Sequence, residues 1–210
     1  ALERGEFVGR PFWLLREPLG AQAQYDYVRR WSRARFEPVT RRGWAPPARS
    51  GRHDRIRIGY LSSDLQEHAT AYLVADVLEQ HDRSRFEVFA YSYGPADDSP
   101  MRRRLVAACE HFVDIAREPD DAAAERIRRD EIDILVDLKG YTAGERLAIL
   151  ARRPCAIQLT WLGYPGTTGA PFVDGVIADA FVIPEGAERF YSERVLRMPF
   201  CYQPNDRQRA

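Results

Sequence analysis

The sequence predicts an α/β fold: a doubly wound, mostly parallel sheet preceded by an N-terminal helical segment. Two observations support this prediction. From residue 55 onward, short strand-like stretches alternate with stretches of helical periodicity, and one of the former, residues 132–138, is almost continuously apolar. Such alternation is typical of right-handed strand–helix–strand units, whose strands are buried on both faces. With 210 residues and 45% apolar content, the chain can bury a core of its own.

The first 54 residues have a different character. Residues 7–17 are rich in apolar and aromatic side chains, which predicts a segment docked on a neighbour. Apolar residues recur at helical spacing over residues 19–36 and predict a helix with one buried face. Prolines, glycines and arginines dominate residues 38–54, which predicts a linker. We therefore expect an N-terminal helical segment and linker over residues 1–54, and an α/β lobe over residues 55–210.

Within the lobe, the pattern predicts seven strands and four helices. Ser99 followed by Pro100 is typical of a helix start, and the acids at residues 120–121 favour another. The expected strands are 55–61, 86–93, 111–116, 132–138, 156–162, 176–183 and 194–199, and the expected helices are 70–80, 99–109, 120–130 and 144–151.

Composition excludes several classes of partner. The 31 basic and 31 acidic residues balance, so no net field favours nucleic acid or an anionic membrane surface. No long apolar run predicts a membrane span. Three widely spaced cysteines favour neither a disulfide framework nor a zinc site, and they fit a cytoplasmic protein. The arginines at 102–104 and 126–129 we interpret as solvated helix faces, and the opening without methionine suggests a fragment of a longer protein.

Polar and glycine-rich sequence follows three of the expected strands. These stretches are residues 62–70, 139–144 and 163–169. Ligands of doubly wound sheets bind outside the carboxyl ends of the strands, so the three loops predict one cleft. Glycine lets backbone approach a ligand closely, and Gly163, Gly166 and Thr167 in the third loop suit a phosphate or a sugar. The alternatives are an ordinary tight turn, and loops that are polar only because they are exposed.

His68 and Asp64 are the candidate catalytic pair. A histidine near a helix start and beside carboxylates suits a general base, or a hydrogen-bonding group to a sugar or phosphate. Asp64 suits a proton acceptor, or a group that orients His68. The competing interpretation is that Asp64 caps the loop and His68 lies at the surface. Thr70 we expect to be the N-cap of the helix that follows.

The absence of the common cofactor-binding motifs argues against a bound cofactor. No two histidines have the spacing of metal ligands, so we predict no metal. The dinucleotide-binding Gly-x-Gly-x-x-Gly and the phosphate-binding P-loop motif are both absent from the sequence. His53, His81 and His111 we expect to be structural or solvated, and Asp137 to be a hydrogen-bonded structural acid.

Several segments closely resemble the amino-terminal catalytic lobe of the protein O-GlcNAc transferases, in particular the bacterial SPINDLY-like members. The resemblance covers nearly everything from residue 55 onward, whereas residues 7–36 resemble more loosely the segment that follows a tetratricopeptide array in that family. The segments that carry it are residues 57–64, 68–70, 86–91, 134–142, 153–167 and 202–206.

The resemblance implies a Rossmann-like lobe of a two-lobed GT-B enzyme. That enzyme would transfer N-acetylglucosamine from UDP-GlcNAc to Ser or Thr hydroxyls of acceptor proteins, with inversion and without a metal. In that interpretation Asp64 and His68 lie near the reacting hydroxyl. The substrate-binding residues would be Thr70, Lys139, Tyr141, Thr142, Gly163, Tyr164, Pro165, Gly166 and Thr167.

Departures from the family pattern limit which residue roles can be carried over to this sequence. Ala69 stands where the animal enzymes have proline, and Arg10 replaces a histidine that some relatives carry near Pro11. The uridine-binding residues and the lysine that balances the departing diphosphate would lie beyond residue 210, in a C-terminal catalytic lobe. Since stabilisation of that leaving group is usually the largest catalytic contribution, we expect this chain alone to be inactive.

Two alternatives remain open at the level of sequence. One is fucosyl transfer from GDP-fucose, because plant SPINDLY proteins also resemble the chain. The other is a non-catalytic protein-interaction module, for which the aromatic residues Phe12, Trp13 and Trp44 are candidates.

Overall fold

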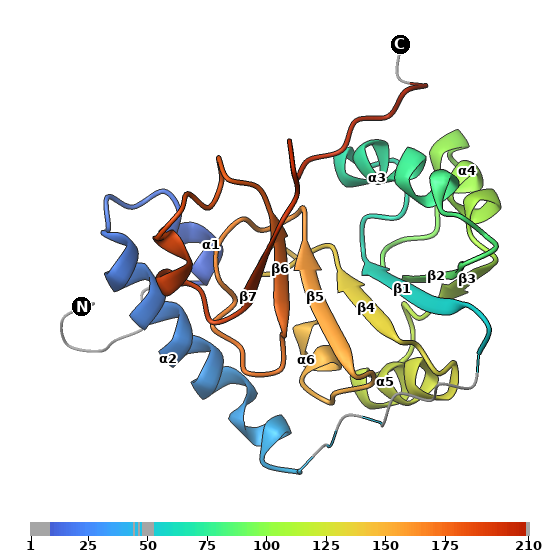
Figure 1. The fold of residues 1–210 in the computed structure, drawn as a ribbon. Coiled ribbons are helices and arrows are strands. Elements are labelled where there is room, and N and C mark those ends of the chain that lie inside the picture. Colours follow the sequence, from blue (N-terminus) through green and yellow to red (C-terminus); the bar gives the residue numbers. More distant parts are fainter. Residues whose placement is uncertain (1–8, 44, 46, 48–52, 209–210) are drawn as a thin grey trace.

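The computed structural model describes residues 9–43, 45, 47 and 53–208, and its centre is a seven-stranded parallel sheet (Figure 1). Its strand order is β3-β2-β1-β4-β5-β6-β7, and every pair of neighbouring strands is parallel. The strands are β1 (Ile56–Ser62), β2 (Phe86–Ser92), β3 (His111–Asp114), β4 (Ile134–Asp137), β5 (Ile157–Trp161), β6 (Gly175–Ala178) and β7 (Arg194–Arg197). The predicted doubly wound sheet is confirmed.

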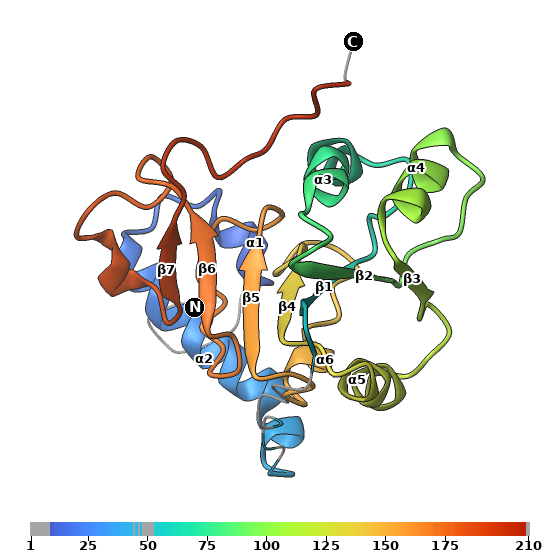
Figure 2. The same cartoon turned by 45° about the vertical axis from the view of Figure 1, so that its right-hand side comes forward.

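Helices cover both faces of this sheet (Figure 2). One face packs against α3 (Ala69–Gln80) and α4 (Pro100–Ala108). The opposite face packs against α5 (Asp120–Arg129), α6 (Leu147–Leu150) and the N-terminal helices α1 (Pro11–Leu14) and α2 (Ala21–Thr40). A short 3₁₀ helix, η2 (Ala187–Phe190), precedes β7.

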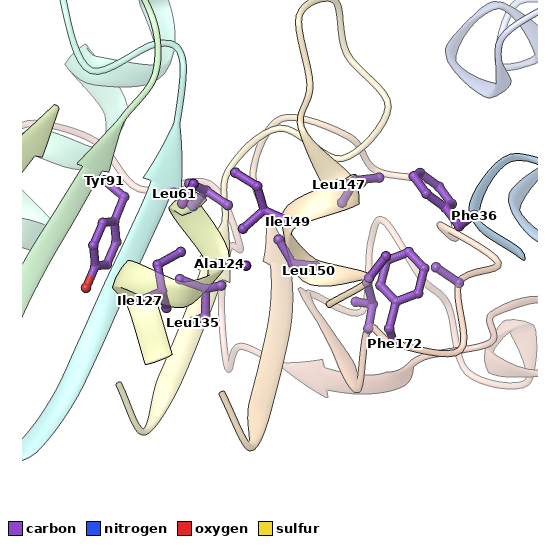
Figure 3. Close-up of a cluster of buried hydrophobic side chains, with 14 of the residues drawn as sticks. Phe36, Leu61, Tyr91, Ala124, Ile127, Leu135, Leu147, Ile149, Leu150 and Phe172 are labelled. Atoms are coloured by element: carbon purple, nitrogen blue, oxygen red, sulfur yellow. The ribbon is translucent and has the colours of Figure 1, made fainter. Parts of the chain in front are cut away.

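The core lies on both sides of the sheet because the central strands are apolar on both faces. Along β4, Leu135 joins the cluster under α5 and α6, whereas Val136 joins the cluster under α3. Figure 3 shows the first cluster, in which Ile127 of α5 and Leu150 of α6 meet Leu135. Burying one such side chain contributes about 1.5–3 kcal/mol. Phe36 of α2 belongs to the same cluster, so the N-terminal helices share the core of the sheet. Trp44 lies outside the described residues.

Three element boundaries differ from the prediction by three residues or more. Helix α2 continues to Thr40 with Pro38 inside it, four residues beyond the expected end. Proline removes its own N–H bond and crowds the carbonyl four residues earlier, but the helix still closes with a bond from the Arg41 N–H to the Glu37 carbonyl (2.9 Å). Helix α6 starts only at Leu147, because Gly144 has a φ of +75°. Strand β6 ends at Ala178, because the Asp179 carboxylate accepts two backbone N–H groups and turns the chain.

The α4 region confirms one prediction and corrects another. Ser99 is the N-cap of α4, and its hydroxyl accepts the Arg102 N–H at 3.1 Å. Arg102 itself is buried rather than solvated: its guanidinium donates to the Leu65 carbonyl and the Ser92 hydroxyl. Its neighbour Arg104 is also committed, to acids of α3 and of the C-terminal segment. A long cationic side chain can satisfy buried acceptors that the sequence pattern does not reveal.

Candidate functional site

The order of the strands leaves a crevice at the carboxyl ends of the paired strands β1 and β4. The chain after β1 passes to α3 on one face, and the chain after β4 passes to α6 on the opposite face. Neighbouring strands whose connections diverge in this way leave room at their carboxyl ends, which is where doubly wound folds bind ligands. The loops that begin at residues 63 and 138 therefore flank the reversal of strand order.

A cavity of about 750 Å³ lies at this place. The loops after β1, β4 and β5 line it together with the segment around α1. Seven of the predicted site residues line it: Asp64, His68, Thr70, Lys139, Tyr141, Thr142 and Gly163. A larger cavity of about 1330 Å³ runs along α2 and contains none of the predicted site residues.

His68 is held by the start of α3. It occupies the N-cap position, with extended backbone (φ −150°, ψ 150°), and its Nδ1 accepts the Thr70 N–H at 3.1 Å. The expectation that Thr70 caps this helix is wrong, since His68 takes that role with a ring nitrogen as the acceptor. The histidine side chain remains 44% exposed. It therefore lies at the mouth of the cavity with its second nitrogen uncommitted to the cap.

Asp64 and Lys139 form a buried ion pair at the base of the cavity. The lysine Nζ lies 2.9 Å from Oδ1 and 2.8 Å from Oδ2, and both side chains are at least 90% buried. The Ser63 hydroxyl donates to Oδ1 at 2.8 Å, and the Thr70 hydroxyl lies 3.4 Å from Oδ2. Burial removes both charges from water, which is costly. The pair is stable only because each carboxylate oxygen has hydrogen-bonding partners.

Hydrogen bonds to Asp137 and from Thr142 fix the turn after β4. Gly140 has a φ of +53°, and its N–H donates to Oδ2 of Asp137 at 2.6 Å. Thr142 closes the turn by donating its hydroxyl to the Lys139 carbonyl at 3.0 Å. Burial raises the pKa of the Asp137 carboxyl to about 7, against the opposing effect of the Gly140 bond. Asp137 is thus the hydrogen-bonded structural acid that its position predicts.

The glycine-rich loop after β5 contributes Gly163 to the cavity lining, whereas residues 164–167 of the same loop do not line the cavity. A Cβ at Gly163 would lie 2.3 Å from the Leu138 carbonyl, so the loops after β4 and β5 touch through backbone. Tyr164 is 2% exposed and packs its ring edge-on against Tyr141, with 5.5 Å between centroids. The four remaining predicted binding residues, Tyr164, Pro165, Gly166 and Thr167, do not line the cavity.

Glu193 accounts for the shape of that loop, and the sequence did not reveal it. Its buried carboxylate accepts the Thr167 hydroxyl at 2.6 Å and the Thr168 N–H at 2.5 Å, and also the Thr168 hydroxyl. Both threonine hydroxyls are therefore committed inside the protein. No motif marks a glutamate just before a strand, so no sequence signal could have identified this role.

The α1 segment supplies the part of the cavity wall that the site prediction omitted. Arg10, Phe12, Trp13 and Arg16 line the same cavity as His68. Trp13 is 61% exposed, and the Arg16 guanidinium lies 5.6 Å above its ring. Phe12 is half-buried, with its ring 6.4 Å from that of Tyr164. The only signal available was the aromatic content of this segment.

The described residues hold neither a cluster of metal ligands nor a membrane-spanning helix. Over residues 9–43, 45, 47 and 53–208, no three His, Cys, Asp or Glu side chains gather as a metal ion would require. Across the same part of the chain, no helix has the length and apolarity to cross a membrane.

Comparison with known proteins assigns the family. The sequence model of glycosyl transferase family 41 matches residues 40–209. The chain belongs to this family. It is 40% identical over 175 residues to SEC of Arabidopsis thaliana, named as a probable UDP-N-acetylglucosamine–peptide N-acetylglucosaminyltransferase, with 83% of this chain and 18% of SEC covered. It is 44% identical over 149 residues to the Caenorhabditis elegans UDP-N-acetylglucosamine–peptide N-acetylglucosaminyltransferase, with 70% and 13% covered.

A solved structure extends the likeness to the fold. A mutant of the Thermobaculum terrenum O-GlcNAc transferase superposes with a TM-score of 0.82 at 36% identity, over 90% of this chain and 36% of that one. The family 41 chain described here thus spans 18% or less of the two curated relatives named above. The resemblance inferred from the sequence is confirmed, and so is the Rossmann-like character of the lobe.

Proposed function

We propose that this chain is the amino-terminal catalytic lobe of a protein O-GlcNAc transferase, which transfers N-acetylglucosamine from UDP-GlcNAc to Ser or Thr hydroxyls with inversion. The observation that carries the proposal is the cavity at the reversal of strand order. It joins His68, the Asp64–Lys139 pair, Thr142 and Gly163, which come from three separate loops. Hydrogen-bonding groups of this kind around a partly apolar cavity suit a sugar. Family membership supports the same reaction.

The proposal includes partners that the chain does not contain. In it, a C-terminal lobe closes over the cavity and carries the groups that stabilise the departing diphosphate. Lys139, the single lysine of the sequence, is already committed to Asp64 and is a poor candidate for that task. The chain alone is therefore proposed to be inactive. Upstream tetratricopeptide repeats, acceptor proteins, a cytoplasmic location and a reaction without metal or other cofactor complete the proposal.

The test uses the full-length protein that contains this chain. It is incubated separately with UDP-GlcNAc and with GDP-fucose, together with a library of Ser- and Thr-containing peptides, and the peptides are then examined by mass spectrometry. We expect the mass of one N-acetylhexosamine to be added from UDP-GlcNAc. Addition of deoxyhexose alone would replace the proposal with fucosyl transfer. Peptide binding without any transfer would favour a protein-interaction module, for which the exposed Trp13 is a contact candidate.

A further inference from the structure

The N-cap hydrogen bond selects one tautomer of the neutral His68 ring. The Thr70 N–H donates to Nδ1 at 3.1 Å, so Nδ1 must offer its lone pair. In a neutral imidazole only one nitrogen carries hydrogen, and here that nitrogen is Nε2. A proton on Nδ1 would instead point at another N–H. The cap therefore makes His68 a donor at Nε2, the ring atom that it does not use at the helix start.

Asp64 does not compete for Nδ1, because Lys139 holds it elsewhere. The nearest carboxylate oxygen, Oδ2, lies 3.6 Å from Nδ1, beyond hydrogen-bonding distance. Both oxygens instead lie within 2.9 Å of the lysine Nζ. In a catalytic Ser–His–Asp arrangement the acid accepts a hydrogen bond from the Nδ1–H group, which leaves the lone pair of Nε2 free to act as base. The arrangement here is the reverse of that one.

We propose that Lys139 is a positioning residue: by clamping Asp64 it keeps the ring proton of His68 on Nε2, so that His68 donates a hydrogen bond to the substrate and does not act as the general base. Nε2 has no lone pair to take a proton from a hydroxyl, and Nδ1 can take one only by giving up the Thr70 bond. The ligand group that such a donor suits is an oxygen of a sugar or phosphate. The functional part of this inference rests on the proposed sugar transfer, whereas the position of the ring proton does not.

Removal of the lysine should reverse the tautomer. In Lys139→Met the Asp64 carboxylate would stay buried without its cation, and the closest ring nitrogen is Nδ1 of His68. The carboxylate would then draw the proton to Nδ1, and the bond from Thr70 would be lost. Arginine at position 139 keeps a cation that can bind both oxygens, so Lys139→Arg should keep the proton on Nε2.

The direct test is ¹⁵N NMR of the histidine rings in the 210-residue chain. Four histidines are present, and His68→Ala identifies the signals of His68. We expect a protonated Nε2 and an unprotonated Nδ1 in the wild type and in Lys139→Arg, with the reverse in Lys139→Met. His81, whose Nε2 lies 2.8 Å from the Tyr60 hydroxyl, is the internal reference and should not change. A wild-type His68 with its proton on Nδ1 would overturn the proposal, as would an unchanged tautomer in folded Lys139→Met.

Should Lys139→Met fail to fold, the double variant Asp64→Asn/Lys139→Met removes both charges together. It should fold and keep the proton on Nε2, because no carboxylate remains to attract it. A proton on Nδ1 in that variant would show that Asp64 does not control the ring, and would contradict the proposal.

Kinetics of the full-length protein separate donor from base. Glutamine at position 68 keeps an N–H donor but cannot accept a proton, so His68→Gln should retain kcat within about tenfold of the wild type, and His68→Ala should lose clearly more. Equal and severe loss in both variants would refute the donor role. If the wild-type protein transfers no sugar, the proposed function fails, and the NMR result still decides where the ring proton lies.

Discussion

The buried Asp137 carboxyl gives a stability prediction that can be worked out from the structure. The side chain is fully buried, Oδ2 accepts the Gly140 N–H, and Oδ1 has no partner among the described residues. Burial raises the pKa of this carboxyl from 3.8 to about 7. The folded protein therefore keeps the proton after the unfolded chain has released it. Unfolding becomes easier as the pH rises from about 4 to about 7, and the loss is complete above that range.

The size of this effect follows from the two pKa values. The difference between 3.8 and about 7 corresponds to about 4 kcal/mol of unfolding free energy, of which about 3 kcal/mol falls above pH 5. In Asp137→Asn the side chain keeps an acceptor for the Gly140 N–H and cannot ionise. The variant should therefore gain stability relative to the wild type by about 3 kcal/mol between pH 5 and pH 8.

The assay is urea unfolding of both proteins across this pH range, with Asp98→Asn as the control. Asp98 is an exposed acid before α4, so its replacement reports the effect of removing one surface carboxylate. Free energies that run parallel for wild type and Asp137→Asn from pH 5 to pH 8 would refute the reasoning. If the difference in unfolding free energy between Asp137→Asn and the wild type became smaller as the pH rises, the direction of the assigned pKa shift would be wrong.

Three further variants test how the loops and the C-terminal segment are held. Gly140→Ala should lower the unfolding free energy by more than about 1 kcal/mol in denaturant titrations, because φ is +53° and the new Cβ would lie 2.4 Å from Tyr164; wild-type stability would contradict this. Glu193→Ala removes the acceptor of the threonine donors, so amide hydrogen exchange in the loop should accelerate, and unchanged exchange would show that the carboxylate is dispensable. Arg104→Ala breaks the pair with Asp206, so limited proteolysis should release the C-terminal segment faster, whereas an equal rate would show that other contacts hold it.

The strands and loops of the sheet could be predicted from the sequence because each depends on residues that lie close together in the chain. Apolar strands, the Ser99 cap and the glycine-rich loops follow from residues that are neighbours in the chain. The parallel order then brought the loops after β1, β4 and β5 together, as the cleft prediction requires.

The chemistry of the candidate site depends instead on contacts that are distant in sequence. Asp64 and Lys139 are 75 positions apart, and Thr167 meets Glu193 across 26, so no local pattern pairs them. The roles of Tyr164 to Thr167 in substrate binding stay predictions, as do the catalytic roles of Asp64 and His68. The histidine cap was missed because Thr70 is the commoner type of N-cap residue.

The most direct test of the account is the transfer rate of the full-length protein carrying His68→Ala, compared with His111→Ala. Both changes remove an imidazole whose side chain is 44% exposed, but His111 lies on β3, paired with Glu87, and does not line the cavity. We predict that kcat/KM for UDP-GlcNAc falls by at least about tenfold in the first variant and stays near wild type in the second. Equal rates in the two variants would contradict the claim that the cavity at the carboxyl ends of β1 and β4 is the site of sugar transfer.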